Sequence, residues 1–460
     1  MAHKKKKDLL TMSAEAPAII LDRSVIASQQ IARVLPGGQV ITKGRNYWLM
    51  LGPGLTTGAS DDDPSGIATY SQTGAQFGYQ FIWLSVWTLP LMGVVQEMCA
   101  RIGLVTGRGL AGNIRIFFSK KVLYACTLLL FAANVINIGA DLGAMAKAAQ
   151  LLMPQLSFGW LVAGFAAVSL GLQIFTPYVR YARYLKWLAL ILLSYVVSAI
   201  LAHLDWHTIA YAVVHPSFNF SKDALLIICA VLGTTISPYL FFWQTSSEVE
   251  EKISQGKTTV RQRRTGVSKY DMRSMRIDVW SGMFLSNLVM FFIIAACGGI
   301  LYPNGITNIT SAAQAAEALR PFAGDASYYL FAIGVIGTGL LAIPVLAGSS
   351  SYALAESFKW KEGLNRKLPQ AYAFYGVIII SMLIGFGINF LQIDPIKALI
   401  YAAVANGLVA PIILLLIVLM ARNRKIMGHW ANRPHTNFIG WATVAVMTVS
   451  GIAAIVSLII

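Results

Sequence analysis

Long apolar runs separated by short polar segments dominate the chain from about residue 47 to its end. A helix needs about 20 consecutive apolar residues to cross the hydrocarbon core of a bilayer. Eleven runs satisfy that requirement, and the third, eighth and tenth are long enough to extend beyond the membrane. The pattern therefore predicts eleven membrane-spanning helices, at residues 47–75, 80–104, 121–150, 157–176, 183–203, 223–247, 277–301, 326–356, 370–391, 394–421 and 437–459.

Two of the predicted spans are interrupted near their centres. The first contains the acidic triplet 61–63 and Pro64, and the sixth contains Ser237 and Pro238. Proline lacks a backbone N–H and its ring clashes with the preceding turn, so neither span can be one continuous helix. Unwound backbone and carboxylates at membrane depth are tolerated only where they line a protein-enclosed or water-filled cavity. Broken helices in corresponding positions of two halves therefore predict a secondary transporter with its binding site at the membrane midplane.

Lysine and arginine residues gather in alternate loops, after the second, fourth, sixth, eighth and tenth predicted spans. The intervening loops hold few cations, namely Lys222, Arg320 and Lys397. Because cationic loops stay in the cytoplasm, this alternation predicts a cytoplasmic N-terminus and a C-terminus on the outside. Residues 1–46, which lack the apolar core of a secretory signal, are then expected to form a cytoplasmic tail.

An odd number of helices in each half gives the two halves opposite orientations in the membrane. The first half covers residues 47–203, the second covers residues 204–421, and each begins with an interrupted helix. The predicted fold is therefore an all-α polytopic membrane protein with a LeuT-type five-plus-five inverted repeat and broken helices 1 and 6. Residues 422–460 carry the eleventh helix, which is appended to the repeat.

The composition agrees with a membrane protein and excludes several other classes. Of the 460 residues, 56% are hydrophobic and 12% are charged, whereas soluble domains carry about 25% charged residues. The net charge of +16 is spread over alternate loops rather than gathered on one surface, so no nucleic-acid partner is expected. The four cysteines lie singly in apolar runs, so neither a disulfide framework nor a zinc site is expected.

The acidic triplet is the main candidate for cation binding. A carboxylate at mid-membrane depth is costly unless it meets a cation, and no lysine or arginine lies in the central portion of any predicted span. Asp63 is therefore the first candidate metal ligand, and unwinding would expose the carbonyl oxygens of Ser60 and Thr234 as further hard ligands. Helix neighbours point about 100° apart, so Asp61, Asp62 and Asp63 cannot all line one site. One of the first two is expected to face an aqueous vestibule or to cap the broken backbone.

The second interruption offers oxygen atoms as ligands. Ser237 and Tyr239 supply hydroxyl groups, and the segment around them contains no thioether, thiol or imidazole. Oxygen ligands suit Mg²⁺, Ca²⁺ and Mn²⁺, whereas softer groups would favour Fe²⁺, Zn²⁺ or Cu⁺.

Three polar residues elsewhere in the spans complete the candidate set. Asn406, in the tenth span, either adds an oxygen ligand or hydrogen-bonds a neighbouring helix. Asp141, in the third span, could accept a proton or a leaving cation. Glu97, in the second span, lies four residues before Arg101, and the two are expected to form an ion pair on the helix surface.

Three segments resemble the Nramp divalent-metal transporters. GPGLTTGASDDDPSG matches the family's Gly-Pro-Gly and Asp-Pro-Gly-Asn elements with identical spacing to Asp63, and QEMCARIGLVTGRGL is similar to its second helix. LGTTISPYLFFWQ occupies the place of the family's Met-Pro-His segment. The likeness extends over most of residues 47–428, and it implies that Asp63 and the carbonyl oxygens of Ser60 and Thr234 hold the metal ion.

The chain departs from the family pattern at the metal-binding positions. Gly66 stands at the family's Asn, Ser237 at its metal-binding Met, and Tyr239 at the following His, while Ala144 replaces the Glu partner of the acid matched by Asp141. Losing the thioether removes the contact that prefers transition metals, and smaller side chains leave room for a partly hydrated Mg²⁺. Gln244 stands where the family has a second His. Loss of both histidines and of the acid–base network argues against proton coupling. The pattern is similar to the divergent Nramp-related magnesium transporters.

The combined prediction is a secondary transporter, not an enzyme, that imports divalent cations by alternating access around Asp63. Mg²⁺ is the favoured substrate and Mn²⁺ is also carried, and no cofactor is expected. The expected setting is a bacterial-type inner membrane, in which a monomer has divalent metal ions and the lipid bilayer as its partners. Two alternatives remain: a proton-coupled Mn²⁺/Fe²⁺ symporter of the Nramp type, and a cation-coupled organic-solute symporter on the same fold. An intramembrane enzyme is disfavoured because the spans contain no HExxH or GxSxG motif.

Overall fold

The computed structural model describes residues 47–459, apart from 49, 177, 202–203, 218–220, 310–311 and 392–394. All regular elements within these residues are helices, as the apolar pattern predicted. The predicted cytoplasmic tail, residues 1–46, lies outside the described residues. From Gly52 onward the helices pack as one unit.

Both interrupted spans are broken in the same way. The halves of the first are α3 (Pro53–Asp61) and α4 (Pro64–Phe77), and the halves of the second are α12 (Lys222–Thr235) and α13 (Pro238–Ser254). Residues 62–63, here called the first break, and residues 236–237, the second break, separate these halves. In each case the second half-helix begins with proline, whose missing N–H has no intrahelical partner to lose at that position. The prediction of broken helices at these positions is confirmed.

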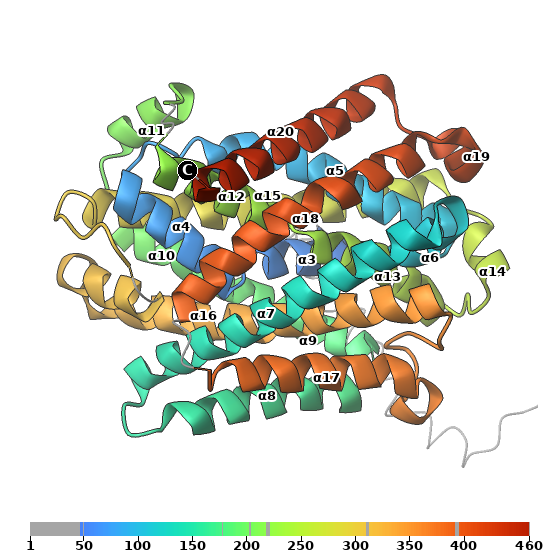
Figure 1. Cartoon of the computed structure of the whole chain (residues 1–460), viewed down its shortest axis with the longest axis horizontal. Coiled ribbons are helices and arrows are strands. Elements are labelled where there is room, and N and C mark those ends of the chain that lie inside the picture. Colours follow the sequence, from blue (N-terminus) through green and yellow to red (C-terminus); the bar gives the residue numbers. More distant parts are fainter. Residues whose placement is uncertain are drawn as a thin grey trace, which may run out of the picture. The chain divides into compact units, whose positions relative to one another are not determined.

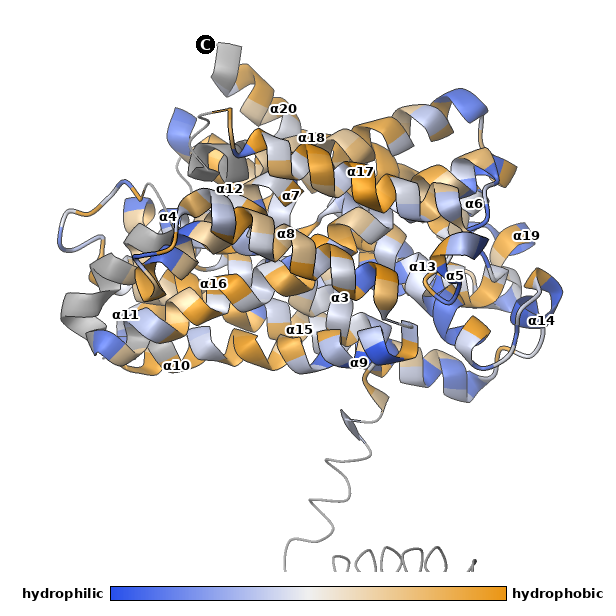
Figure 2. Cartoon of the chain, turned by 90° about the horizontal axis from the view of Figure 1, so that it is seen from below, coloured by the Kyte–Doolittle hydropathy of each residue, from blue (hydrophilic) through white to orange (hydrophobic). Residues whose placement is uncertain are grey.

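The remaining long helices alternate with short connecting ones. The long helices are α5 (Leu84–Thr106), α7 (Lys120–Leu152), α8 (Phe158–Phe175), α9 (Tyr178–Leu188) continued through η1 (Ala189–Leu192) into α10 (Leu193–Leu201), α15 (Lys269–Ile300), α16 (Ala312–Phe358), α17 (Tyr372–Ile388), α18 (Pro395–Arg422) and α20 (Pro434–Ile459). The short ones are α6 (Leu110–Phe117), α11 (Trp206–Val214), α14 (Val260–Arg264) and α19 (Arg424–Met427). Figure 2 shows that α8, α16 and α17 are largely hydrophobic, whereas hydrophilic residues gather near α14 and α19.

Nine helical segments within the described residues are long and apolar enough to cross a membrane. The joined pair α12 and α13 is one of them, and the stretch from α9 to α10 is another. The halves α3 and α4 are individually too short, and α17 has 17 residues. The number of eleven spans therefore stays a prediction, as do the membrane orientation and the boundaries of the two halves.

Helices from distant segments of the chain pack around the first broken helix (Figure 1). α15 lies along α3 and α4, and α13, α16 and α18 each contact at least one of these halves. The close approach of α3 to α15 depends on glycine, because a β-carbon at Gly58 would collide with the backbone of Gly282. This packing holds the first break in the interior, where side chains from distant segments reach it.

Candidate metal-binding site

Asp63 lies at the N-terminus of α4 and joins three helices. Its Oδ1 accepts hydrogen bonds from Ser65 Oγ at 2.5 Å and from the N–H of Gly66 at 2.8 Å. Its Oδ2 accepts one from Asn137 Nδ2 of α7 at 2.7 Å. The Tyr239 hydroxyl of α13 lies 3.3 Å from Oδ2 and shares its single hydrogen between Asp63 and the closer Ser60 O. The residue is only 1% exposed. A carboxylate is favoured at a helix N-terminus, because the free N–H groups and the helix dipole are positive there.

The two carbonyl oxygens predicted as ligands both lie beside a hydroxyl group. The Tyr239 hydroxyl donates to Ser60 O at 2.8 Å, and Ser237 Oγ lies 2.6 Å from Thr234 O, to which it donates. A carbonyl oxygen has two lone pairs, so each can still accept a second partner. In this structure each of the two oxygens already accepts one hydrogen bond from a hydroxyl group. Their role as metal ligands stays a prediction.

Gly66 brings α4 close to the second broken helix. A β-carbon on Gly66 would lie 3.2 Å from Asp61 O and 3.3 Å from Thr234 Oγ1. Contacts of 3.0–3.4 Å are tighter than nearly all real β-carbon contacts, so a larger residue would require a small displacement of its neighbours. The wider site expected from this glycine is therefore still a prediction.

Three further carboxyl groups are buried near Asp63. Asp61 accepts a hydrogen bond from Ser286 Oγ of α15 at 2.7 Å. Neither Asp62 nor Asp141 has a hydrogen-bond partner among the described residues, and both are 0% exposed. None of these carboxyl groups forms an ion pair with a described lysine or arginine. Since Asp61 and Asp62 are both buried here, the vestibule-facing acid also stays a prediction.

The metal-binding set cannot consist of carboxylates, thiols and imidazoles alone. Within the described part of the chain, no three such side chains converge closely enough to hold a metal ion. A metal ion bound at Asp63 would therefore need neutral oxygen ligands as well. Asn406 of α18 is one candidate, because its Oδ1 is buried without a hydrogen-bond partner among the described residues. The role of Asn406 as a metal ligand stays a prediction.

Sequence reasoning overlooked Asn137, the residue of α7 that contacts Asp63. An asparagine in an apolar span is commonly a helix–helix contact, and nothing in its own surroundings distinguishes it. Its spacing could have identified it, since it lies four residues before Asp141 and the two share one face of the helix.

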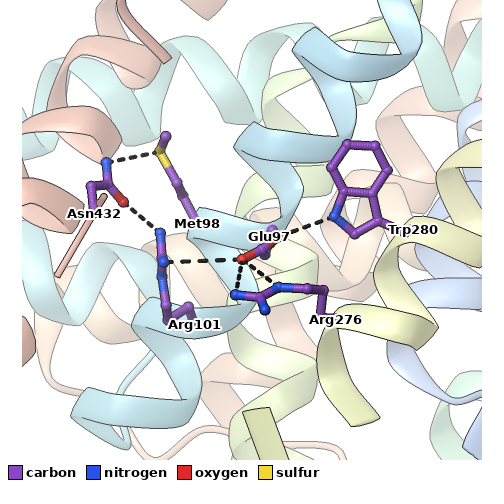
Figure 3. A network of polar contacts seen from close by, with 6 residues as sticks. All are labelled: Glu97, Met98, Arg101, Arg276, Trp280 and Asn432. Atoms are coloured by element: carbon purple, nitrogen blue, oxygen red, sulfur yellow. Dashed lines mark hydrogen bonds and ion pairs between the residues drawn. The ribbon is translucent and has the colours of Figure 1, made fainter. Parts of the chain in front are cut away.

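Glu97 forms the predicted ion pair with Arg101 and a closer one with Arg276. Its carboxylate lies 4.0 Å from Arg101 NH1 but 2.9 Å from Arg276 NH2 on α15, and it accepts a hydrogen bond from Trp280 Nε1 at 3.0 Å. Figure 3 shows Arg101 lying between Glu97 and Asn432, to which it donates a hydrogen bond. Glu97 and Arg101 are both buried, so this cluster joins α5, α15 and the segment before α20 instead of forming a helix-surface pair.

Two broken helices with buried polar breaks, inside a bundle of membrane-length helices, define a membrane transport protein of the broken-helix class. The family model for natural resistance-associated macrophage protein-like (Nramp) proteins matches residues 54–457. The chain therefore belongs to the Nramp family, which confirms the resemblance seen in the sequence.

Relatives and solved structures agree with this assignment. The chain is 25% identical over 422 residues to the divalent metal cation transporter MntH of Caldanaerobacter subterraneus subsp. tengcongensis, covering 90% of this chain and 93% of that protein. It is also 25% identical over 408 residues to MntH of Klebsiella pneumoniae, covering 86% and 91%. The solved manganese transporter of Eremococcus coleocola superposes with a TM-score of 0.67 at 19% identity, over 92% of this chain and 89% of that one. The predicted LeuT-type fold is thereby confirmed.

Proposed function

We propose that this protein imports divalent metal cations across a bacterial-type inner membrane by alternating access around Asp63. The observation that carries this proposal is a buried carboxylate at the first break, with hydroxyl, amide and N–H neighbours and no described cationic side chain. The relatives named above are described as divalent metal cation and manganese transporters, which agrees with a dication as the substrate.

We further propose that Mg²⁺ is the favoured substrate and that Mn²⁺ is also carried, as in the Nramp-related magnesium transporters. The hydrogen-bond partners of Asp63 are oxygen and nitrogen donors, and Ser237 supplies a hydroxyl at the second break. Hard oxygen groups suit Mg²⁺, which keeps several of its waters when bound. An inside-negative potential would drive import, because two charges crossing 100 mV gain about 4.6 kcal/mol. Proton coupling is then unnecessary.

The second candidate function is proton-coupled Mn²⁺ or Fe²⁺ symport. Two observations favour it: Asp141 is a buried carboxyl group without a hydrogen-bond partner among the described residues, and Met145 lies one turn further along α7. Met145 Sδ faces Gly339 of α16, where Pro64, the first residue of α4, also lies, so a buried thioether is close to the first break. Thioethers favour softer metal ions than Mg²⁺.

Proteoliposomes containing Mg²⁺ and Mn²⁺ indicators and a pH dye distinguish the two functions. We expect Mg²⁺ entry without internal acidification, and we expect Asp63→Ala to abolish it. Mn²⁺ entry accompanied by acidification, with no Mg²⁺ entry, would instead establish the proton-coupled symporter. Full metal flux through Asp63→Ala would contradict the assignment of the binding site. The same vesicles, oriented by protease access to the loops, test the proposed cytoplasmic N-terminus and external C-terminus.

A further inference from the structure

A cavity of about 540 Å³ is lined by residues of α13, of α16 and of the loops that follow these two helices. Its volume lies within the range of about 300–1,000 Å³ that is usual for small-molecule sites. Four cationic side chains line it, namely Arg263, Lys359, Lys361 and Arg366. None of them belongs to the candidate metal-binding site, so the cavity points to a second kind of ligand.

Arg263 is fixed in the wall of this cavity. The residue is 9% exposed, and its guanidinium donates from Nε to Gly107 O at 2.9 Å and from Nη1 to Thr258 O at 2.7 Å. Because a guanidinium carries five N–H donors, these two bonds leave others for a ligand. A planar guanidinium matches the oxygens of a phosphate group, and a side chain that is already fixed loses less entropy when it binds.

Lys359 has a backbone conformation that favours glycine. It follows the last residue of α16 with a φ of +62°, and the next N–H, that of Trp360, donates to Ala355 O at 2.9 Å. This bond is typical of a Schellman cap, in which glycine usually takes the left-handed position. No other described residue except glycine has a positive φ. A strained residue that glycine could replace without cost suggests a use for the lysine side chain.

Trp360 adds an aromatic surface to the cavity. Its ring stacks on Phe358, with ring centroids 5.0 Å apart and an interplanar angle of 22°. The residue is 41% exposed and lines the cavity, so part of the ring remains available to a ligand. Aromatic side chains of this kind stack on nucleic-acid bases with little preference for one base over another.

The acidic residues of the wall leave an excess of positive charge. Glu250 accepts a hydrogen bond from the Tyr352 hydroxyl at 2.9 Å, and Glu356 accepts one from the N–H of Gly112 at 2.8 Å. Burial, and then repulsion by Glu356 and Glu250, raises the pKa of Glu362 to about 9, so this carboxyl group is uncharged near neutral pH. A protonated carboxyl group donates a hydrogen bond, and the buried Oε2 of Glu362 has no partner among the described residues. The wall therefore suits an anion with several oxygen acceptors.

We propose that this cavity binds a nucleoside phosphate. The base stacks on Trp360, and the phosphate oxygens bind the guanidinium of Arg263 and the ammonium groups of Lys359 and Lys361. The orientation predicted from the cationic loops places the cavity on the cytoplasmic side. A bound ligand would join α13, which begins at the second break, to α16, which contacts α3 and α4. The inference goes beyond the proposed function and does not depend on which cation is carried.

The test is equilibrium binding of ATP to the purified full chain in phosphatidylcholine nanodiscs, which carry no net lipid charge, with EDTA present. We expect saturable binding, and we expect adenosine and tripolyphosphate each to bind about tenfold more weakly than ATP, because each lacks one half of the contacts. Lys361→Ala should raise the Kd about fivefold. Lys367→Ala removes the same charge from the same loop but does not line the cavity, so its Kd should stay within about twofold of wild type.

Lys359→Gly separates binding from folding. Glycine adopts a positive φ without strain, so this variant should melt at a higher temperature than wild type. Its Kd for ATP should nevertheless rise about fivefold, since it has lost a charged ligand-binding group. A purely structural role for Lys359 would leave the Kd unchanged.

The remaining outcomes would overturn the proposal. Absence of saturable ATP binding by the wild type removes it, without affecting the proposed function, since metal uptake is measured without nucleotide. Equal affinities for ATP and tripolyphosphate would assign the cavity to phosphate alone and contradict the role of Trp360. Loss of ATP binding in nanodiscs that contain phosphatidylglycerol would assign it to an anionic lipid headgroup instead. Failure of metal uptake would overturn the proposed function and leave the nucleotide site standing.

Discussion

The N-terminus of α3 is capped by a residue of another helix, which yields a prediction about opening of the first half-helix. Its N-cap position is Gly52, which has no side chain to cap it. Asp278 of α15 replaces that cap: its Oδ1 accepts the N–H of Gly52 at 2.7 Å and of Leu55 at 3.0 Å, and its Oδ2 accepts the N–H of Gly54 at 2.7 Å. A carboxylate at this position also interacts favourably with the helix dipole.

Asp278→Asn should weaken this attachment by a calculable amount. The remaining carbonyl oxygen can keep the bonds to Gly52 and Leu55, but the new NH₂ group meets the N–H of Gly54, donor to donor. A hydrogen bond to a charged group contributes about 1.5–3 kcal/mol, and an unsatisfied buried N–H adds to the loss. We therefore expect about 3 kcal/mol less stability for the attached state of α3. Since about 1.4 kcal/mol corresponds to a tenfold change, the detached state should be populated roughly 100-fold more.

Thiol labelling measures that population. Thr57 is buried on α3, so a cysteine introduced there reacts only when the half-helix detaches. When reclosing outpaces labelling, the rate follows the detached population, and Asp278→Asn should raise it roughly 100-fold. Asp271→Asn is the matched control, because Asp271 caps its own helix by accepting the N–H of Ser268 at 2.9 Å. A labelling rate in Asp278→Asn within threefold of the parent would refute the capping argument.

Two further predictions concern the loop after α16. The Glu250 carboxylate of α13 accepts a hydrogen bond from the backbone N–H of Asn365 at 3.2 Å, beside the cavity of about 540 Å³. Because this bond holds the loop, Glu250→Gln should speed proteolysis of residues 359–371. The control Glu251→Gln should leave the rate of proteolysis unchanged. Burial, and then repulsion by Glu356 and Glu250, raises the pKa of Glu362 in this loop to about 9 from an ordinary value of 4.5. The folded protein then binds this proton more tightly than the unfolded chain, so stability falls as pH rises from about 4.5 to about 9. Glu362→Gln should flatten that decline in thermal-shift measurements; an unchanged slope would contradict the assignment.

Local chemistry explains which parts of the fold were predictable from sequence. Proline alone does not interrupt an apolar span, since Pro90 and Pro411 lie inside the continuous helices α5 and α18. Pro64 and Pro238 each follow polar residues, so both breaks could still be placed without knowing the packing. Asp63 could be named as a candidate ligand in the same way, because a carboxylate before a proline at membrane depth has few structural uses.

Contacts between distant segments explain what was missed. Asn137 reaches Asp63 across 74 positions of sequence, and Glu97 prefers Arg276, 179 positions away, to its helical neighbour Arg101. Sequence spacing identifies neighbours within one helix, but helix packing decides which residues of separate helices meet. The sequence-based pairing of Glu97 with Arg101 named a residue that is near but is not the main partner.

The two breaks share a form but differ in polarity. Asp63 brings a carboxylate to the first break, whereas Ser237 at the equivalent position donates backward to Thr234 O and leaves α13 without a side-chain cap. The N-terminus of α13 is therefore a positive helix end, and Tyr239 in its first turn holds that end beside Asp63 through a hydrogen bond of 3.3 Å. A positive helix end disfavours a cation and a carboxylate attracts one, so we expect a cation beside Asp63 rather than at the N-terminus of α13.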